Sequence, residues 1–299
     1  LNKSFLFMQT GTKMKSELKQ LLDRMDQLKA EVDKYKPLKP EQEQRLMQKV
    51  RLDWNYHSSH VEGNTLTYGE TKALLFWGIT AGGKPIKDII EMRGHDKVVQ
   101  LLYEIVKEKG RPLTEQFISE MHEIILGEPY DIDAITPDGQ PKKRKVVPGR
   151  YKQLPNHVKT KDGSIFYFAT PEETPAKMND LMNWFKENDS KLHPLITAAG
   201  FYYQFVRIHP FDDGNGRMAR ILMNFILMMH DYPPAIISTD DREGYLQSLA
   251  YADSGDLDKF IEYIGVQEIA SLELVLKAAK GEIIEEEVDL DKLVKSLKI

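Results

Sequence analysis

A polar, glycine-containing run between two apolar segments constrains this chain more than any other feature. The run is His209-Pro-Phe-Asp-Asp-Gly-Asn-Gly-Arg-Met-Ala-Arg220. Apolar residues recur at helical spacing over 196–206 before it and over 218–229 after it, so a buried helix is predicted on each side. The fold must therefore present one polar loop between two packed helices, and chemistry can take place at that loop.

The glycines and arginines of the run predict an anion site. Gly214 and Gly216 lack a Cβ and can take positive φ, which lets backbone N–H groups converge at the start of the second helix. The helix dipole adds partial positive charge there. Arg217 and Arg220 are three residues apart, share one helix face and can reach the same anion. A polyphosphate fits this pattern better than a single carboxylate does.

The carboxylate and the imidazole of the run add reactive groups. Asp213 is an oxygen ligand beside the anion site, and Mg²⁺ that bridges phosphate oxygens usually needs only one or two protein carboxylates. His209, with an ordinary pKa of about 6.5, can take a proton from an attacking hydroxyl at neutral pH. Each residue alone also fits a structural role. Their combination within twelve residues favours a functional site.

The run resembles the signature of Fic domains, His-x-Phe-x-Asp/Glu-Gly-Asn-Gly-Arg-x-x-Arg, with every fixed position present. The resemblance implies an all-α, mainly helical fold with a small β-hairpin flap, and transfer of AMP from ATP to a hydroxyl of a target protein. It implies that His209 is the catalytic general base and that Asp213 holds Mg²⁺. The residues that would bind the nucleotide phosphates are Gly214, Asn215, Gly216, Arg217 and Arg220.

A second motif precedes this run. Ser58 and Glu62 are one helical turn apart, and Gly63 can end a helix in the left-handed conformation, so a short helix near 57–63 is predicted. Considered alone, Glu62 fits a solvated residue at the end of a helix. Many Fic proteins carry an inhibitory helix with the pattern Ser/Thr-x-x-x-Glu-Gly/Asn, which these residues match, and its position resembles the N-terminal class.

The resemblance allows two functional roles for Glu62. If Glu62 pairs with Arg220, that guanidinium cannot hold the γ-phosphate, and ATP binds in a non-productive pose. Alternatively, the same carboxylate positions a water that removes AMP from modified targets. A non-catalytic protein that senses nucleotide with the same pocket is a third hypothesis, and the sequence leaves these alternatives open.

The composition changes over 127–170, where glycine, proline and β-branched residues replace the helical pattern. Asp-Gly at 162–163 lies between two extended segments and predicts a hairpin. This is either a surface hairpin or, by the resemblance, a flap that binds a target segment as an added strand. The flap residues would be Asn156, His157, Val158, Lys159 and Thr160. The basic run 142–145 is predicted to be a solvated loop.

Two residues after the run bear on the base of the nucleotide. Tyr245 falls where Fic proteins often place an aromatic residue near the adenine. Asp253 stands where an asparagine that contacts the base is frequent. An ionised aspartate accepts hydrogen bonds and does not donate them, so the preference for ATP over other nucleotides is open.

The remaining pattern predicts helices throughout. We expect an N-terminal helical arm over 1–54, a catalytic domain over 55–265, and a C-terminal helical tail over 266–299 that either packs or mediates a homodimer. Thr67 and Glu70 have capping-box spacing. Glu91 and His95 lie one turn apart, but without a partner motif they are predicted to be a helix-surface pair and not metal ligands.

Composition narrows the partners. The net charge of −5 gives no general attraction to nucleic acid or anionic membranes. The chain has no cysteine, which excludes disulfides and thiolate chemistry. Its apolar runs are shorter than the roughly 18 residues that span a bilayer. We expect a cytoplasmic protein whose partners are ATP and a target protein with a Ser, Thr or Tyr hydroxyl.

Overall fold

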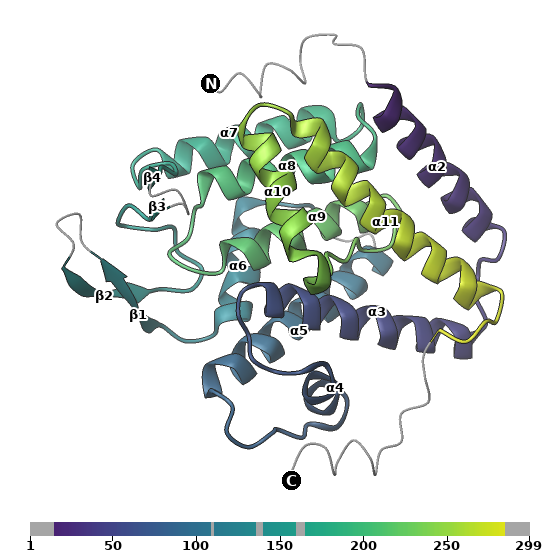
Figure 1. Cartoon of the computed structure of the whole chain (residues 1–299), viewed down its shortest axis with the longest axis horizontal. Coiled ribbons are helices and arrows are strands. Elements are labelled where there is room, and N and C mark those ends of the chain that lie inside the picture. The colour runs from purple at the N-terminus through teal and green to yellow at the C-terminus, as the bar shows by residue number, and fades with distance from the viewer. Residues whose placement is uncertain (1–14, 109–110, 136–139, 160–164, 285–299) are drawn as a thin grey trace.

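The two helices predicted around the polar run form the centre of the fold in a computed structural model (Figure 1). They are α8 (Pro194–Ile208) and α9 (Asn215–Met229), and they pack against each other. Both are apolar on nearly all sides, as helices surrounded by protein must be. The structure describes residues 15–108, 111–135, 140–159 and 165–284.

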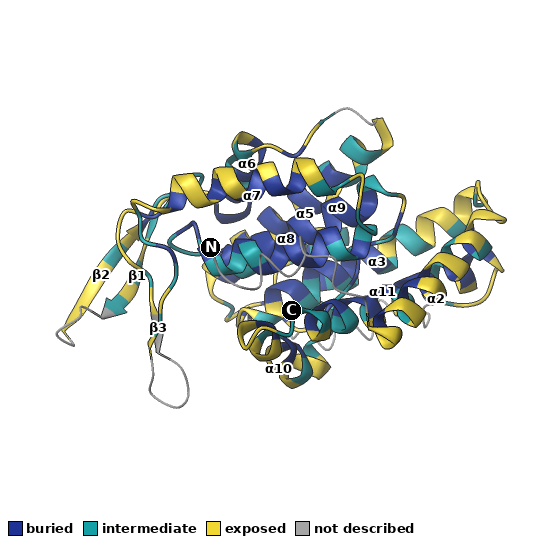
Figure 2. Cartoon of the chain, turned by 90° about the horizontal axis from the view of Figure 1, so that it is seen from above, coloured by how far each residue is buried: buried dark blue, intermediate teal, exposed yellow. Residues whose placement is uncertain are grey.

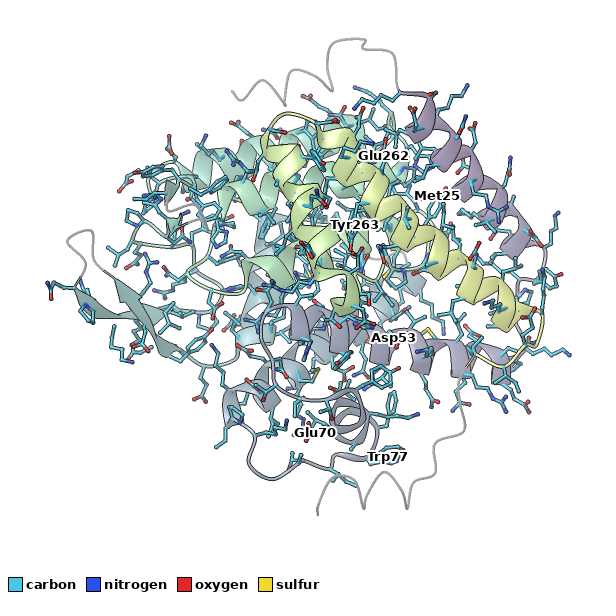
Figure 3. The ribbon with its side chains drawn as sticks, in the orientation of Figure 1. Met25, Asp53, Glu70, Trp77, Glu262 and Tyr263 are labelled. Atoms are coloured by element: carbon cyan, nitrogen blue, oxygen red, sulfur yellow. The ribbon has the colours of Figure 1, made fainter. Side chains whose placement is uncertain are left out.

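The N-terminal segment packs into the same core as the rest. Helix α2 (Ser16–Asp33) lies along α11 (Leu257–Ala279), and Met25 is fully buried between them (Figure 3). The next helix, α3 (Pro40–Val61), is continuous. The short separate helix predicted near 57–63 is therefore wrong, since neither Gly nor Pro interrupts α3 and the segment forms its last turn.

The division of the chain into three parts stays a prediction. Both of its boundaries fall within continuous helices, the first within α3 and the second within α11. Of the predicted tail, residues 285–299 lie outside the described part of the chain.

Three helices follow α3: α4 (Tyr68–Trp77), α5 (Ile86–Glu108) and α6 (Glu115–Leu126). The predicted capping box is confirmed, because the Thr67 hydroxyl accepts from the Glu70 amide and the Glu70 carboxylate accepts from the Thr67 amide. Helix α4 covers a small separate apolar cluster. Its last residue, Trp77, lies at the surface (Figure 3).

Two antiparallel hairpins follow α6. The first joins β1 (Tyr130–Ile135) to β2 (Pro141–Val146), and the second joins β3 (Val158–Lys159) to β4 (Ile165–Phe166). The second confirms the predicted hairpin, although its turn, including Thr160, lies outside the described residues. The prediction of a loop over 142–145 is wrong. This run is part of β2, where Lys143 pairs across the hairpin with Asp133.

The last elements are α7 (Thr174–Asn188), η1 (Thr239–Asp241) and α10 (Arg242–Asp253). His193 caps α8, since its Nδ1 accepts from the Leu195 amide. Burial is greatest in α5, α8 and α9 at the middle of the molecule, whereas the β1–β2 hairpin projects from one end with mostly exposed residues (Figure 2). None of the described helices combines the length and the apolarity needed to cross a membrane.

Candidate active site

The polar run forms a tight loop whose ends are set by backbone conformation. Helix α8 ends at His209, which has φ of 52°, and α9 begins after Gly214, which has φ of 77°. A non-glycine residue with positive φ is uncommon and is often found at functional sites. The Asn215 amide closes the loop, because its Oδ1 accepts from the Phe211 N–H at 2.9 Å and its Nδ2 donates to the Phe211 carbonyl at 2.9 Å. The Asn215 side chain therefore uses its Oδ1 and one of its two Nδ2 protons to hold the loop.

His122 on α6 holds the same loop in place. Its Nδ1 accepts from the Gly149 amide at 2.8 Å, so its Nε2 carries the proton and donates to the Asp213 carbonyl at 2.9 Å. Its ring stacks on Phe211, with 3.8 Å between the ring centroids. Burial lowers the pKa of His122 to about 4, so the ring is neutral. No motif in the sequence singled out this residue.

His209 is held as a neutral base. Burial, followed by the nearby Lys152 ammonium, lowers its pKa to about 4. The Phe168 ring stacks on the imidazole at 4.0 Å between ring centroids. Lys152 is fixed by the Ile208 carbonyl at 3.1 Å and by Asn156 Oδ1 at 2.8 Å. At neutral pH the imidazole is unprotonated and can accept a proton.

The first turn of α9 offers backbone donors. Its first hydrogen bond runs from the Met218 N–H to the Gly214 carbonyl, so the N–H groups of Asn215, Gly216 and Arg217 precede the helical ladder. Gly216 leaves room for its neighbour Glu62. A Cβ at this position would lie 2.2 Å from Glu62 Oε1, so any other residue here would displace the Glu62 carboxylate.

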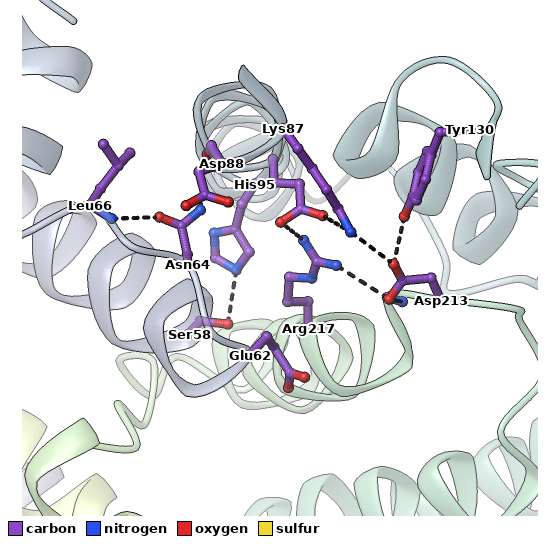
Figure 4. Close-up of polar contacts among 12 residues, drawn as sticks. Ser58, Glu62, Asn64, Leu66, Lys87, Asp88, His95, Tyr130, Asp213 and Arg217 are labelled. Atoms are coloured by element: carbon purple, nitrogen blue, oxygen red, sulfur yellow. Dashed lines mark hydrogen bonds and ion pairs between the residues drawn. The ribbon is translucent and has the colours of Figure 1, made fainter. Parts of the chain in front are cut away.

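The two arginines of the run are buried and paired with different carboxylates. Arg217 is 3% exposed, and its Nη1 lies 2.8 Å from Glu91 Oε2, with Asp213 Oδ1 at 3.6 Å from Nη2 (Figure 4). Arg220 is also 3% exposed, and its Nη2 donates to Glu62 Oε1 at 2.8 Å. The residues expected to bind phosphate lie together in the first turns of α9. The two charged ones, Arg217 and Arg220, are paired with protein carboxylates.

The prediction that Glu91 and His95 form a surface pair is wrong. Glu91 is 8% exposed and His95 is fully buried. The sequence carried a signal for this, because these two positions continue the apolar stripe of α5 through Val98 and Leu102 at helical spacing. Glu91 holds Arg217, and His95 contacts Ser58, so both belong to the surroundings of the site.

Glu62 lies over the site from the end of α3. Ser58 contacts the same arginine, since its Oγ accepts from Arg220 Nε at 3.0 Å and its carbonyl accepts from Arg220 Nη2 at 2.8 Å. Burial acts to raise the pKa of Glu62, but Arg220 outweighs this effect and lowers it, so Glu62 is ionised. Gly63 has φ of 93°, as predicted for a residue that ends the helix.

Asp213 directly precedes Gly214 and the backbone donors of α9. Its Oδ2 accepts from the Tyr130 hydroxyl at 2.6 Å and lies 3.6 Å from Lys87 Nζ, and its Oδ1 accepts from the Gly214 N–H at 2.6 Å (Figure 4). Burial acts to raise the pKa of Asp213, but Arg217 and these donors together lower it. Within the described residues, no three acidic or histidine side chains gather as a metal site. One ionised carboxylate fits Mg²⁺ only if phosphate oxygens complete the coordination.

Comparison with known proteins identifies the family of the chain. A sequence profile described as the Fic/DOC family matches residues 112–227. A Fic-domain-containing signaling protein from Bacteroides thetaiotaomicron has 39% sequence identity and a TM-score of 0.78, and the match covers 89% of this chain and 100% of that one. The chain belongs to the Fic/DOC family.

This Fic protein is also similar to curated protein adenylyltransferases. Protein adenylyltransferase fic-1 of Caenorhabditis elegans is 30% identical over 238 residues, which are 79% of this chain and 43% of the relative. Protein adenylyltransferase Fic of Nematostella vectensis is 34% identical over 210 residues, which are 70% of this chain and 45% of the relative. The chain thus spans less than half the length of these relatives.

The flap residues of this Fic protein have varied surroundings. The Asn156 side chain donates to the Phe211 carbonyl at 2.8 Å, so it ties this segment to the loop between α8 and α9. The His157 ring contacts the Tyr167 ring. Val158 and Lys159 pair with Phe166 and Ile165 through the main chain. Docking of a target by these residues stays a prediction.

The expected adenine contacts lie on α10. Tyr245 is buried, and its hydroxyl bonds the Tyr202 hydroxyl. Asp253 Oδ1 accepts from the Tyr203 hydroxyl at 3.1 Å and pairs with Arg207 at 3.1 Å. Both residues therefore have protein partners on α8, and their contact with a base also stays a prediction.

Proposed function

We propose that this Fic protein is an adenylyltransferase that moves AMP from ATP to a Ser, Thr or Tyr hydroxyl of a target protein, and that Glu62 inhibits it. The observation that carries the proposal is the loop between α8 and α9, where a neutral His209 and the donors of the first turn of α9 share one short segment. The names of the similar curated proteins agree with this activity.

The chemistry follows from these groups. His209 takes the proton of the target hydroxyl, whose oxygen attacks the α-phosphorus while the bond to pyrophosphate breaks. The N–H groups of α9, with Arg217 and Arg220, stabilise the charge that develops on the phosphates. When bound at Asp213, Mg²⁺ supplies further neutralisation of that charge. Rate then comes from positioning and charge stabilisation.

Inhibition follows from the place of Glu62. Its carboxylate occupies the space next to Gly216 and is hydrogen-bonded to Arg220. A γ-phosphate at Arg220 would meet an ionised carboxylate, and the like charges repel each other. ATP can bind productively only when Glu62 leaves or is removed.

Removal of AMP is a second candidate function, because the Glu62 side chain is 37% exposed and ionised and so can hold a water next to the site. A homodimer, a cytoplasmic location and the absence of nucleic-acid and membrane partners are further predictions.

Label transfer tests the proposal. ATP labelled at the α-phosphate should mark protein with Glu62→Gly and should leave no label with the double variant that adds His209→Ala. Binding of ATP without any label would indicate a nucleotide sensor, and transfer from the γ-phosphate would indicate a kinase-like reaction. If the parent protein strips AMP from labelled protein and Glu62→Gly does not, the second function is supported.

A further inference from the structure

A buried chain of hydrogen bonds reaches Arg220 from α5. His95 Nε2 lies 3.1 Å from Ser58 Oγ, and Ser58 Oγ lies 3.0 Å from Arg220 Nε (Figure 4 shows the first contact). On its other side, His95 Nδ1 lies 2.7 Å from Asn55 Oδ1. Asn55 and His95 are 0% exposed, and Ser58 and Arg220 are 3% exposed, so water does not compete for these contacts.

The contacts of Asn55 fix the direction of each hydrogen bond in this series. Asn55 Nδ2 donates to the Arg51 carbonyl at 2.8 Å and to Asp96 Oδ1 at 3.0 Å. Asp96 is itself held by the Arg51 guanidinium at 2.6 and 2.7 Å. Because both Asn55 protons are used, its Oδ1 must accept, and His95 Nδ1 must carry the proton.

The imidazole then dictates the orientation of Ser58. Burial, followed by Arg220 and Arg217, lowers the pKa of His95 to about 3, so the ring is neutral and its Nε2 accepts. The Ser58 hydroxyl therefore donates to His95. Its oxygen lone pairs are left to face Arg220 Nε, which can only donate.

We propose that His95 is a positioning residue that acts through Ser58 to hold Arg220 against the last turn of α3, where Glu62 pairs with it. Without His95, the Ser58 hydroxyl would turn to a carbonyl one turn back in α3, as serines in helices commonly do. Its lone pairs would leave Arg220 Nε, and the arginine would lose one of its anchors to the inhibitory turn. The effect on activity rests on the proposed function.

The variant His95→Met removes both hydrogen bonds and keeps a side chain of similar bulk. In the parent background we expect transfer of α-phosphate label to rise about tenfold, the effect of one hydrogen bond to a charged group. In the Glu62→Gly background we expect no further rise, since the inhibitory contact is already absent. A fall in both backgrounds would overturn the proposal and assign His95 a purely structural role.

Asn224→Leu is the matched control. Asn224 is 1% exposed on α9, one helical turn after Arg220, and makes two hydrogen bonds with the backbone of Ala235. Its loss should lower thermal stability without raising label transfer. A rise like that of His95→Met would show that loosening of the core alone releases the activity, and it would overturn the proposal.

The Arg220 Nε–H resonance gives a test that does not depend on activity. In ¹H–¹⁵N spectra, assigned with Arg220→Lys, it should exchange slowly with solvent in the parent and in Asn224→Leu. It should shift and exchange faster in His95→Met. An unchanged resonance in His95→Met would refute the relay. If Glu62→Gly transferred no label, the proposed function would fail, and this resonance would still decide whether the relay exists.

Discussion

Arg217 and Arg220 lie three residues apart on one helix with the same exposure, yet they are held from different parts of the fold. The acidic partners of Arg217 are Glu91 on α5, whose side chain is 11% exposed, and Asp213 in the loop between α8 and α9. The acidic partner of Arg220 is Glu62, whose side chain is 37% exposed at the end of α3. The first pair is built into the site, whereas the second lies at its edge and can be released.

The largest expected effect is on the built-in pair. Glu91→Gln should lower the free energy of unfolding by about 3 kcal/mol, because removal of one partner leaves a buried charge short of compensation. Urea unfolding measures this effect. Asp133→Asn, which breaks the exposed pair with Lys143, is the control and should cause no measurable change. Equal effects of the two variants would contradict the distinction between Arg217 and a surface pair.

The releasable pair should affect activity more than stability. Glu62→Gly should raise label transfer from α-labelled ATP by roughly 5- to 150-fold, the usual range for coupling between two sites. The urea midpoint should change less than it does with Glu91→Gln, because Arg220 keeps its two hydrogen bonds to Ser58. An unchanged rate in this variant would remove the case for autoinhibition.

The hydrogen bond from Tyr130 to Asp213 should influence the Mg²⁺ concentration needed for activity. Tyr130→Phe removes the donor to Asp213 Oδ2, and loss of such an outer partner typically weakens metal affinity about tenfold. In the Glu62→Gly background, the Mg²⁺ concentration for half-maximal transfer should rise by about that factor. Tyr251→Phe, at an exposed position of α10, should leave it unchanged. Equal Mg²⁺ dependence in both variants would show that Tyr130 does not position the ligand.

The smallest effect concerns pH. Burial lowers the pKa of His209 to about 4, so the neutral base is present above this value and is lost only as the pH falls through it. Label transfer by Glu62→Gly should therefore change less than about twofold between pH 7.5 and 5.5. With an ordinary pKa of about 6.5, the rate would fall about tenfold by pH 5.5. A fall in rate centred near pH 6.5 would show that His209 is not shielded from water as its burial indicates.

The sequence predicted the parts of the site that depend on neighbouring residues. The helices around the loop, the positive φ of Gly63 and Gly214, and the capping box at Thr67 follow from residue types a few positions apart. Gly216 does not take the positive φ considered for it, because it lies inside α9. The pairing of Glu62 with Arg220 was predicted only through the family resemblance.

The predictions from sequence were wrong where segments distant in the chain decide the burial or pairing of a residue. Glu91 and His95 were placed at the surface, but the partners that bury them come from α9 and α3. The β1–β2 hairpin was missed because β2 is mostly a run of basic residues, and its pairing with β1 is decided across the hairpin. The short helix near 57–63 was predicted from a local pattern of residues, whereas this segment is the last turn of α3.

A structure of the Glu62→Gly variant with Mg²⁺ and a non-hydrolysable ATP analogue tests the central claim most directly. The account predicts the γ-phosphate at Arg220, the other phosphates on the N–H groups of the first turn of α9, and His209 facing the α-phosphorus. A nucleotide bound elsewhere, or an Arg220 that stays on Ser58 with no phosphate beside it, would contradict the claim that Glu62 and the γ-phosphate compete for one cation.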